Sequence, residues 1–310
     1  MQHLKSIDDL QLESCELTIG SFDGIHIGHQ AIIQQMKVAA AKSHAPVVVL
    51  TFHPHPSIVL RGNRTAFYIN TPDEKASQLG ALGVDFVITQ RFDINLSKIK
   101  AADFLDWISR QLNFRGLWAG ENFALGHQRE GNRSYLEKAS HTRGFELHIV
   151  EPMLEGGEIV SSTRVREALR SGDVSRVARY LGRYFAIPGM VVKGAGRGKE
   201  LGIPTANLKI WNKRAYPGIG VYACMAKAGG KDYRAVTNIG VRPTFDEDRN
   251  EPIIEAHLLD FESDMYGEEI TLSFIERLRD ERRFSGVDEL LREIERDIHR
   301  AKSILTNYKA

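Results

Sequence analysis

The sequence predicts an α/β protein with an N-terminal doubly wound parallel-sheet domain and a C-terminal β-barrel domain that carries a packed C-terminal helix. From residue 16 to about 150, apolar β-prone runs alternate with helical segments, which is typical of βαβ units. After about residue 185, the β-prone runs follow one another with only turns between them, as in a small barrel. A chain of 310 residues can bury two cores, and we expect domains at 1–184 and 185–310.

The composition is that of a globular protein and argues against several classes of function. Lys and Arg number 41 against 40 Asp and Glu, and a formal net charge of +1 argues against broad nucleic-acid binding. No apolar run approaches the roughly 18 residues that span a bilayer, so we expect no membrane partner and a cytoplasmic location. Cys15 and Cys224 lack the spacing of metal ligands and are expected to be buried thiols.

The first domain should contain strands at 16–19, 47–52, 86–89, 116–119 and 145–150, with helices near 30–42, 72–82, 101–112 and 132–142. Thr71 and Pro72 supply an N-cap and a first-turn proline for the second of these helices. Ligands of parallel sheets bind at the carboxyl ends of the strands. The loops after the first, second and fourth strands should therefore meet at one edge of the sheet.

A glycine-rich turn follows the first strand and leads into the first helix. Strand, turn and helix in this order aim backbone N–H groups and the positive end of a helix at an anion. His26 and His29 lie in this turn, where imidazoles can donate hydrogen bonds to phosphate oxygens without acting as nucleophiles. The candidate phosphate-binding residues around them are Gly20, Phe22, Asp23, Gly24 and Gly28.

Two further loops at this edge carry polar residues, and each has a purely structural alternative. Residues 53–56 read His-Pro-His-Pro and are either a rigid extended exit from a strand or, with the irregular segment up to Asn70, part of a substrate lid. Residues 120–131 form either a plain turn or a substrate-binding loop that uses Asn122 and Arg129.

Three hydroxyl side chains, those of Ser161, Ser162 and Thr163, stand at the start of a further helix, with Arg166 one turn later. Ordinary N-capping needs only one hydroxyl. Hydroxyls, free backbone amides and a guanidinium together predict a cradle for a tetrahedral anion, with helix capping alone as the alternative.

The second domain should contain strands at 187–193, 220–228, 233–239, 253–261 and 270–278. A final helix should follow, with Ser285 and Asp288 in a capping box. Its apolar stripe should pack on the barrel, and consists of Val287, Leu290, Leu291, Ile294 and Ile298.

A second glycine-rich stretch opens this domain. It either closes over phosphates or forms a surface hairpin, and it is not a Walker loop because no Gly-Lys-Ser/Thr ends it. Thr205 and Asn207 follow it and offer neutral oxygen ligands on one side of an extended segment, which suits Mg²⁺. The candidate phosphate-binding residues of the stretch are Gly194, Gly196, Arg197, Gly198, Lys199 and Gly202.

Glu255 and His257 share one face of an alternating strand. We expect Glu255 to project into the barrel, where a carboxylate is costly to bury without a purpose. The carboxylate either takes the proton of an attacking hydroxyl or forms a salt bridge with Arg234 or Arg242.

Seven motifs in this order, spread over residues 10–300, resemble the prokaryotic bifunctional riboflavin kinase/FMN adenylyltransferase (FAD synthetase) family. Leu125 stands where the family commonly has phenylalanine, and so lacks a ring that can stack on a flavin. The motifs are Gly20-x-Phe22-Asp23-Gly24-x-His26-x-Gly28-His29, Thr51-Phe52-x-Pro54-His55-Pro56, Gly120-x-Asn122-Phe123, Ser161-Ser162-Thr163-x-x-Arg166, Gly202-x-Pro204-Thr205-Ala206-Asn207, Asn238-Ile239-Gly240-x-Arg242-Pro243-Thr244 and Glu255-x-His257-Leu258-Leu259-Asp260.

The resemblance implies a C-terminal riboflavin kinase domain and an N-terminal nucleotidyltransferase domain. The first would move the γ-phosphoryl group of ATP to riboflavin, with Glu255 as general base and Mg²⁺ on Thr205 and Asn207. In the second, the FMN phosphate would attack the α-phosphorus of another ATP, giving FAD and pyrophosphate, with His26 and His29 on the α-phosphate. By the same resemblance, the β- and γ-phosphates are held by Ser161, Ser162, Thr163 and Arg166, and the flavin or nucleotide contacts His55, Pro56, Asn122, Arg129, Arg279 and Phe284.

The implied partners are therefore the small molecules riboflavin, FMN and ATP, and we expect a monomer or a weak homo-oligomer. Three alternatives are an enzyme that keeps only one of the two activities, a non-enzymatic flavin or nucleotide carrier, and a tRNA-charging enzyme. The last is disfavoured because the sequence has no Lys-Met-Ser-Lys-Ser signature.

Overall fold

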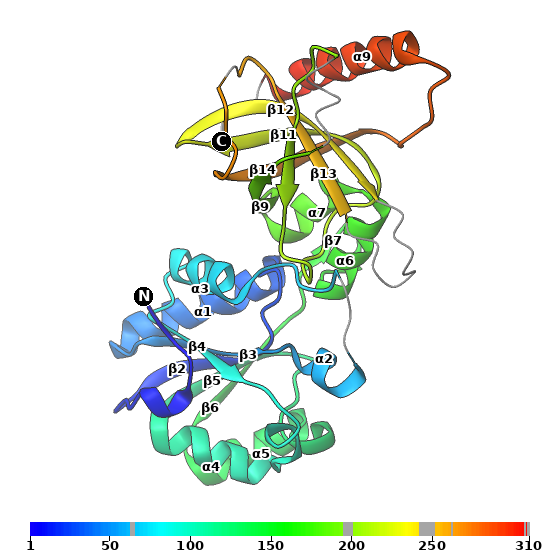
Figure 1. The fold of residues 1–310 in the computed structure, drawn as a ribbon. Helices are drawn as coiled ribbons and strands as arrows, with labels where there is room; N and C mark the ends of the chain where they lie inside the picture. Colours follow the sequence, from blue (N-terminus) through cyan, green and yellow to red (C-terminus); the bar gives the residue numbers. More distant parts are fainter. Residues whose placement is uncertain (63–65, 195–200, 242–251, 262, 307, 309–310) are drawn as a thin grey trace. The chain divides into compact units, whose positions relative to one another are not determined.

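The computed structural model describes residues 1–62, 66–194, 201–241, 252–261, 263–306 and 308. The chain divides into two compact units (Figure 1), of which unit 1 comprises Met1–Arg64 and Tyr68–Ser162, and unit 2 comprises Thr65–Phe67 and Thr163–Ala310. Nearly all of helix α6 (Ser162–Ser171) and the whole of α7 (Val174–Leu181) thus belong with unit 2, although both precede residue 184. The functional boundary at residue 184 stays a prediction.

Unit 1 is built on six parallel strands in the order β1-β4-β3-β2-β5-β6. The five predicted strands are confirmed, and a short strand, β1, adds a sixth at the edge. Because β2 lies between β3 and β5, the strand order reverses there, and the carboxyl ends of β2 and β5 flank the expected ligand site. The strands are β1 (Gln2–Leu4), β2 (Cys15–Ile19), β3 (Val47–His53), β4 (Phe86–Arg91), β5 (Phe114–Gly120) and β6 (Glu146–Val150).

Helices cover both faces of this sheet, with α1 and α3 on one face and α4 and α5 on the other (Figure 1). Each face buries its own core, around Met36 and Leu79 on the first and around Ile108 and Leu136 on the second. Thr71 caps α3 as predicted, in a capping box with Glu74. The elements are α1 (Ile27–Ser43), α2 (Pro56–Arg61), α3 (Pro72–Ala81), α4 (Ala101–Leu112), α5 (Arg133–Arg143), the 3-10 turns η1 (Ile7–Asp9), η2 (Leu96–Lys98) and η3 (His127–Arg129), and the hairpin β7 (Leu154–Glu155) and β8 (Glu158–Ile159).

Unit 2 is a closed barrel of antiparallel strands in the order β10-β13-β12-β11-β14-β9. Its interior is packed with side chains such as those of Tyr222, Ile254 and Phe274, which are at most 1% exposed. The five predicted strands are present, and β10 is an additional short strand. The strands are β9 (Phe185–Val192), β10 (Ala206–Lys209), β11 (Gly220–Ala228), β12 (Lys231–Val241), β13 (Pro252–Leu258) and β14 (Glu269–Arg279).

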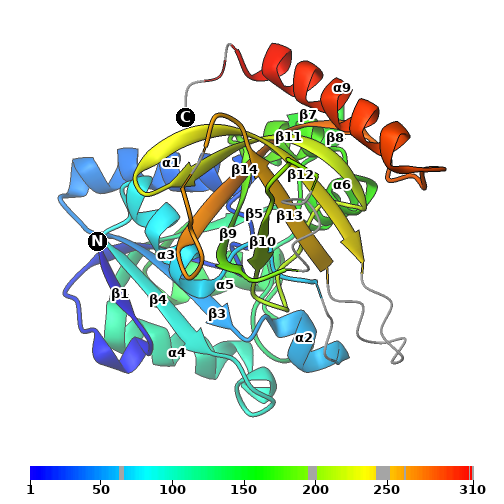
Figure 2. The ribbon, with the colours of Figure 1, turned by 45° about the horizontal axis from the view of Figure 1, so that its top comes forward.

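Helix α9 (Val287–Leu305) packs on the barrel as predicted, against β11, β12 and β14 (Figure 2). Its contact runs through the C-terminal half of the helix, where Ala301 and Leu305 are buried, whereas Val287 is 53% exposed. The predicted capping box is wrong. Gly286 is the N-cap, and the hydroxyl of Ser285 donates to the carboxylate of Glu289, one residue beyond the predicted partner.

Both cysteines are buried and unpaired, as predicted. Burial raises the pKa of the Cys15 thiol and, in the barrel, that of Cys224 to about 12, so neither is a thiolate at neutral pH. Among the described residues, no helix combines the length and apolar character needed to cross a membrane.

Candidate active sites

The turn between β2 and α1 is a tight, buried loop in the structure. Phe22, Gly24 and Ile25 have positive φ angles of 47°, 84° and 42°, and both apolar side chains are at most 2% exposed. Two non-glycine residues in the left-handed region are costly, and they persist because their side chains are buried in the core of unit 1. His26 is the extended N-cap residue, so the free amides of α1 begin directly after it.

His26 and His29 form a stacked pair, with ring centroids 3.7 Å apart and planes 21° from parallel. The Phe22 ring lies 4.7 Å from the His29 ring. Gly28 makes room for the pair, because a Cβ at this position would lie 3.2 Å from two atoms of the His26 ring. The sequence placed the histidines in one turn, and the structure brings their rings into contact.

Both imidazoles are neutral at neutral pH. Burial lowers the pKa of His26 to about 4 and lowers that of His29 well below 6.5, with a further lowering from the nearby charges of His26 and Lys75. Among the described residues, Nδ1 of each ring is buried without a hydrogen-bond partner. A buried unpaired N–H is rarer than an unpaired acceptor, so we expect the single proton on Nε2, where each ring can donate to a ligand oxygen.

Asp23 holds the turn in place, and its carboxylate faces protein rather than a ligand. The carboxylate accepts the backbone N–H groups of Ile69, at 3.1 Å, and of Asn70, at 3.4 Å. Its backbone carbonyl accepts the hydroxyl of Ser162 at 2.8 Å. The first residue of α6 therefore lies beside the glycine-rich turn, which fits the predicted pairing of these two segments.

The remaining members of the predicted anion cradle are divided between the units. Ser161 and Ser162 belong to unit 1, whereas Thr163 and Arg166 are counted with unit 2. Nε of Arg166 donates to the carbonyl of Phe67 at 2.8 Å, and the guanidinium lies 4.0 Å from the centre of the Phe67 ring. Arg166 is therefore already engaged within unit 2, and its role toward phosphate stays a prediction.

The two other loops of unit 1 have defined structures. His55 caps α2, since its Nδ1 accepts the backbone N–H of Ser57 at 3.1 Å, and Pro56 is the first residue of that helix. Asn122 and Arg129 are both exposed and are joined, because the guanidinium of Arg129 donates to the Asn122 carbonyl at 2.7 Å. Leu125 is 7% exposed and belongs to the core, so its side chain serves packing.

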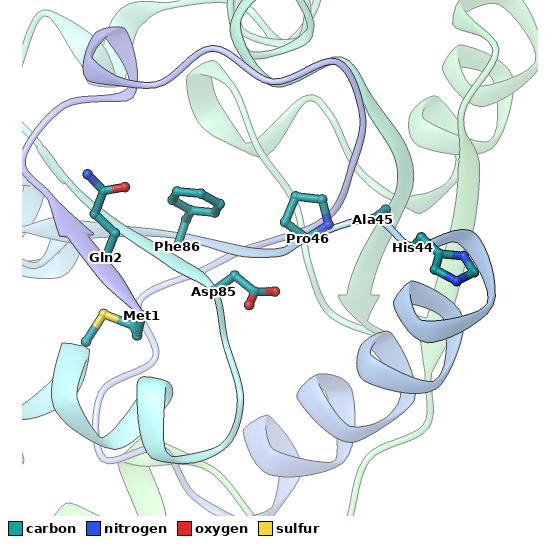
Figure 3. Close-up of a pocket in the computed structure, with 7 residues that line it drawn as sticks. All are labelled: Met1, Gln2, His44, Ala45, Pro46, Asp85 and Phe86. Carbon is teal, nitrogen blue, oxygen red and sulfur yellow. The ribbon is translucent and has the colours of Figure 1, made fainter.

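A hollow of about 630 Å³ on unit 1 contains none of the predicted site residues. It is lined at the amino ends of β1, β3 and β4 by Gln2, Pro46, Asp85 and Phe86, among others (Figure 3). The glycine-rich turn lies at the carboxyl ends of the strands, which is the opposite edge of the sheet.

Glu255 lies on the outer face of the barrel, so the prediction that it points inward is wrong. Its neighbours in β13, Ile254 and Ala256, are at most 1% exposed and fill the interior, while Glu255 is half-buried on the alternate face. Strand register sets Glu255 directly between Asn207 of β10 and Asn238 of β12. Directly paired residues share a face, so the carboxylate has an amide side chain on each side.

The described surroundings of Glu255 provide no counter-charge for its carboxylate. Among the described residues it forms no ion pair, and Arg234 pairs instead with Asp260 at 3.1 Å. The other predicted salt-bridge partner, Arg242, lies outside the described residues. Oδ1 of Asn238 is buried and has no hydrogen-bond partner in the described part of the chain. An orphaned oxygen beside a carboxylate that no described residue pairs with is typical of a site that is completed by a ligand.

The segment that carries Thr205 and Asn207 is fixed from two sides. Gly194 lies against the Asn207 side chain so closely that a Cβ at position 194 would overlap the amide group. Nδ1 of His257 lies 2.8 Å from the carbonyl of Pro204 and must carry the proton, because a carbonyl only accepts. Oxygen donors from Thr205, Asn207, Asn238 and Glu255 suit a hard cation such as Mg²⁺, so the residues fit the predicted metal.

Four of the predicted phosphate-binding residues, Gly196, Arg197, Gly198 and Lys199, lie outside the described residues. Gly202 is exposed and has a φ of 74°. Arg279 is held by Asp297 of α9 through hydrogen bonds of 2.8–3.1 Å, and its guanidinium lies 5.6 Å from the centre of the Phe284 ring. The structure therefore ties Arg279 to the helix that covers the barrel.

Comparison with known proteins identifies both halves of the chain. A model of the FAD synthetase family matches residues 8–164, and a riboflavin kinase model matches residues 181–305. The chain belongs to the bifunctional riboflavin kinase/FMN adenylyltransferase family. Membership gives this enzyme a riboflavin kinase activity in its C-terminal part and an FMN adenylyltransferase activity in its N-terminal part, with riboflavin, FMN and ATP as substrates.

Relatives with the same two activities in their names cover nearly the whole chain. The bifunctional riboflavin kinase/FMN adenylyltransferase of Escherichia coli K12 is 37% identical over 92% of this chain and 91% of its own length. The Bacillus subtilis 168 enzyme of the same name is 35% identical over 94% of this chain and 93% of its own length. A Streptococcus pneumoniae crystal structure titled a macrolide-efflux protein superposes with a TM-score of 0.90 at 30% identity, covering 99% of both chains.

Proposed function

We propose that Glu255 is the general base of the kinase reaction and that Thr205 and Asn207 hold its magnesium ion. The carboxylate would take the proton of the riboflavin 5′-hydroxyl while that oxygen attacks the γ-phosphorus of ATP, and FMN and ADP would leave. The observation that carries this assignment is the register that sets Glu255 beside Asn207, with no ion pair on the carboxylate among the described residues. Mg²⁺, when bound, would neutralise phosphate charge.

In the N-terminal half, the histidine pair would stabilise adenylyl transfer by donating hydrogen bonds. The FMN phosphate attacks the α-phosphorus of ATP, the bond to pyrophosphate breaks, and negative charge grows on the phosphate oxygens. Neutral imidazoles cannot protonate the leaving group at neutral pH, but their Nε2–H groups can donate to those oxygens. The amides of the turn and the hydroxyls of Ser161 and Ser162 would hold the remaining phosphates.

The substrate-contacting residues are likewise divided between the adenylyl site and the kinase site. We assign substrate contacts to His55, Pro56, Asn122 and Arg129 in the adenylyl site and to Arg279 and Phe284 in the kinase site. A cytoplasmic location and a monomeric or weakly oligomeric state also stay part of this proposal.

Product analysis of two variants of the full chain tests the proposal. Glu255→Gln removes the base without changing the size of the side chain, and it should abolish FMN formation from riboflavin while FAD formation from added FMN continues. His29→Ala should do the reverse, with FAD formation reduced by ~10²–10³-fold. Chromatography after incubation with ATP and either riboflavin or FMN measures both. Loss of both reactions in either variant, or of neither, contradicts the assignment.

A further inference from the structure

A lysine is buried beneath the glycine-rich turn, and none of the functions described above uses it. Lys75 of α3 is 7% exposed. Its Nζ donates to the carbonyl of Ser21 at 2.9 Å and to the hydroxyl of Thr51 at 2.8 Å. The hydroxyl of Thr51 also contacts the Ser21 carbonyl, at 3.0 Å, so the ammonium is fixed to the back of the turn.

The charge of Lys75 has no matching carboxylate at ion-pair distance. In the described part of the chain, no Asp or Glu oxygen lies within 4.0 Å of its Nζ, although the more distant Asp23 attracts it. Burying an ammonium is costly unless a counter-charge compensates it. Both oxygens that it contacts belong to neutral groups. The unit therefore carries a buried positive charge that no carboxylate contacts and that only the more distant Asp23 offsets, under the turn that we assign to the phosphates.

We propose that Lys75 is the fixed cation of the adenylyl-transfer site, and that the triphosphate of ATP supplies its missing counter-charge through the turn. Lys75 is a positioning residue. It orients Ser21 through a hydrogen bond and would attract the phosphates by its charge, without touching them. The proposal rests on the assignment of residues 20–29 to the phosphates. It explains why a costly charge is kept where an apolar side chain would fill the same space.

The charge of Lys75 is also sensitive to pH. Burial lowers its pKa from 10.5 to about 8, against the opposing attraction of Asp23 in the turn. The other titratable groups near it are His29 of α1 and His3 of β1, and the Lys75 charge lowers the pKa of both, so neither adds a positive charge at pH 8. As the pH rises through about 8, Lys75 loses its proton and the turn should lose affinity for ATP.

The test compares Lys75→Met with Lys75→Arg in the full chain, with FMN and ATP as substrates. Lys75→Met should raise the KM for ATP at pH 7 by tenfold or more. Its thermal unfolding temperature should be equal to or above that of the parent, because a buried charge has been removed. Lys75→Arg, which stays charged, should have a lower KM for ATP than Lys75→Met. It should also lack the fall in kcat/KM that the parent shows at alkaline pH. Riboflavin kinase activity of the same samples is the internal control and should not change.

The possible outcomes separate this inference from the assignment of the site. An unchanged KM for ATP in Lys75→Met overturns the role of the lysine. If Lys75→Met fails to fold, the pH profile of Lys75→Arg decides. A fall in kcat/KM at alkaline pH that persists in Lys75→Arg overturns the role of the lysine, and a fall that disappears supports it. If His29→Ala also leaves adenylylation intact, the phosphate site itself has been misplaced. If only His29→Ala is impaired, the site stands and the lysine is a structural support.

Discussion

Alanine at position 194 should damage the kinase site through Asn207. A Cβ on residue 194 would lie 2.8 Å from Oδ1 of Asn207 and would overlap its amide nitrogen. The Asn207 backbone cannot retreat, because β10 is paired with β9 on one side and with β13 on the other. The amide group must therefore rotate away, and its oxygen moves by about an ångström or more from the position that we assign to the metal.

Displacement of a group that holds or orients a metal costs about 10- to 100-fold in metal affinity or activity. We therefore expect kcat/KM for riboflavin phosphorylation in Gly194→Ala to fall by about 10- to 100-fold. The Mg²⁺ concentration that gives half-maximal rate should rise by a similar factor. Titration of Mg²⁺ at saturating ATP, with FMN formation followed by chromatography, measures both quantities. Adenylylation of added FMN should stay at the parent rate.

Gly286→Ala is the matched control for this experiment. It also adds one methyl group to unit 2, but residue 286 has an extended φ of −171° and no heavy atom within 4 Å of the added Cβ. Its kinase rate and Mg²⁺ requirement should equal those of the parent. A Gly194→Ala enzyme with a normal Mg²⁺ requirement would show that Asn207 is not a metal ligand or that its position does not matter.

Two further predictions concern the histidine pair. Gly28→Ala favours the helix by about 1 kcal/mol but places a Cβ 3.2 Å from the His26 ring. The melting temperature should therefore not fall, while the rate of adenylylation should fall about tenfold. An unchanged rate would contradict a role for the stacked geometry of the two rings. Because burial lowers the pKa of His26 to about 4, the unfolded chain binds a proton between pH 6.5 and 4 that the folded chain does not. The free energy of unfolding of unit 1 should therefore decrease as the pH falls through this range, with His26 alone contributing roughly 3 kcal/mol at pH 4. Urea titrations should show a smaller slope in His26→Asn than in the parent, and the slope that remains comes from His29, whose pKa is also lowered by burial.

Local patterns were sufficient to predict most of the elements. The run at 220–228 is the strand β11, and Thr71 caps α3 with the predicted chemistry. The strands that were missed, β1, β10 and the hairpin strands β7 and β8, contain only two to four residues, and such runs are too short to show a period. They form because neighbouring strands offer them hydrogen bonds, which is a property of the assembled sheet and barrel.

The sequence was less informative about the direction and burial of single side chains. Alternation set Glu255 and His257 on one face of β13, but a period of two cannot tell which face is the inside of a barrel. Lys75 occupies a helix position where a lysine usually meets water, and nothing in its neighbours along the chain signals burial. Its site arises from the turn after β2 and from Thr51 of β3, which only tertiary packing brings together.

The central claim is that two independent ATP-dependent sites act in succession on one flavin. A mixture of Glu255→Gln and His29→Ala, supplied with riboflavin, Mg²⁺ and ATP, tests it most directly. Neither variant alone should convert riboflavin to FAD, whereas the mixture should do so after a lag in which FMN accumulates. If each variant keeps its own half-reaction and the mixture still makes no FAD, the two sites are not independent and the account is wrong.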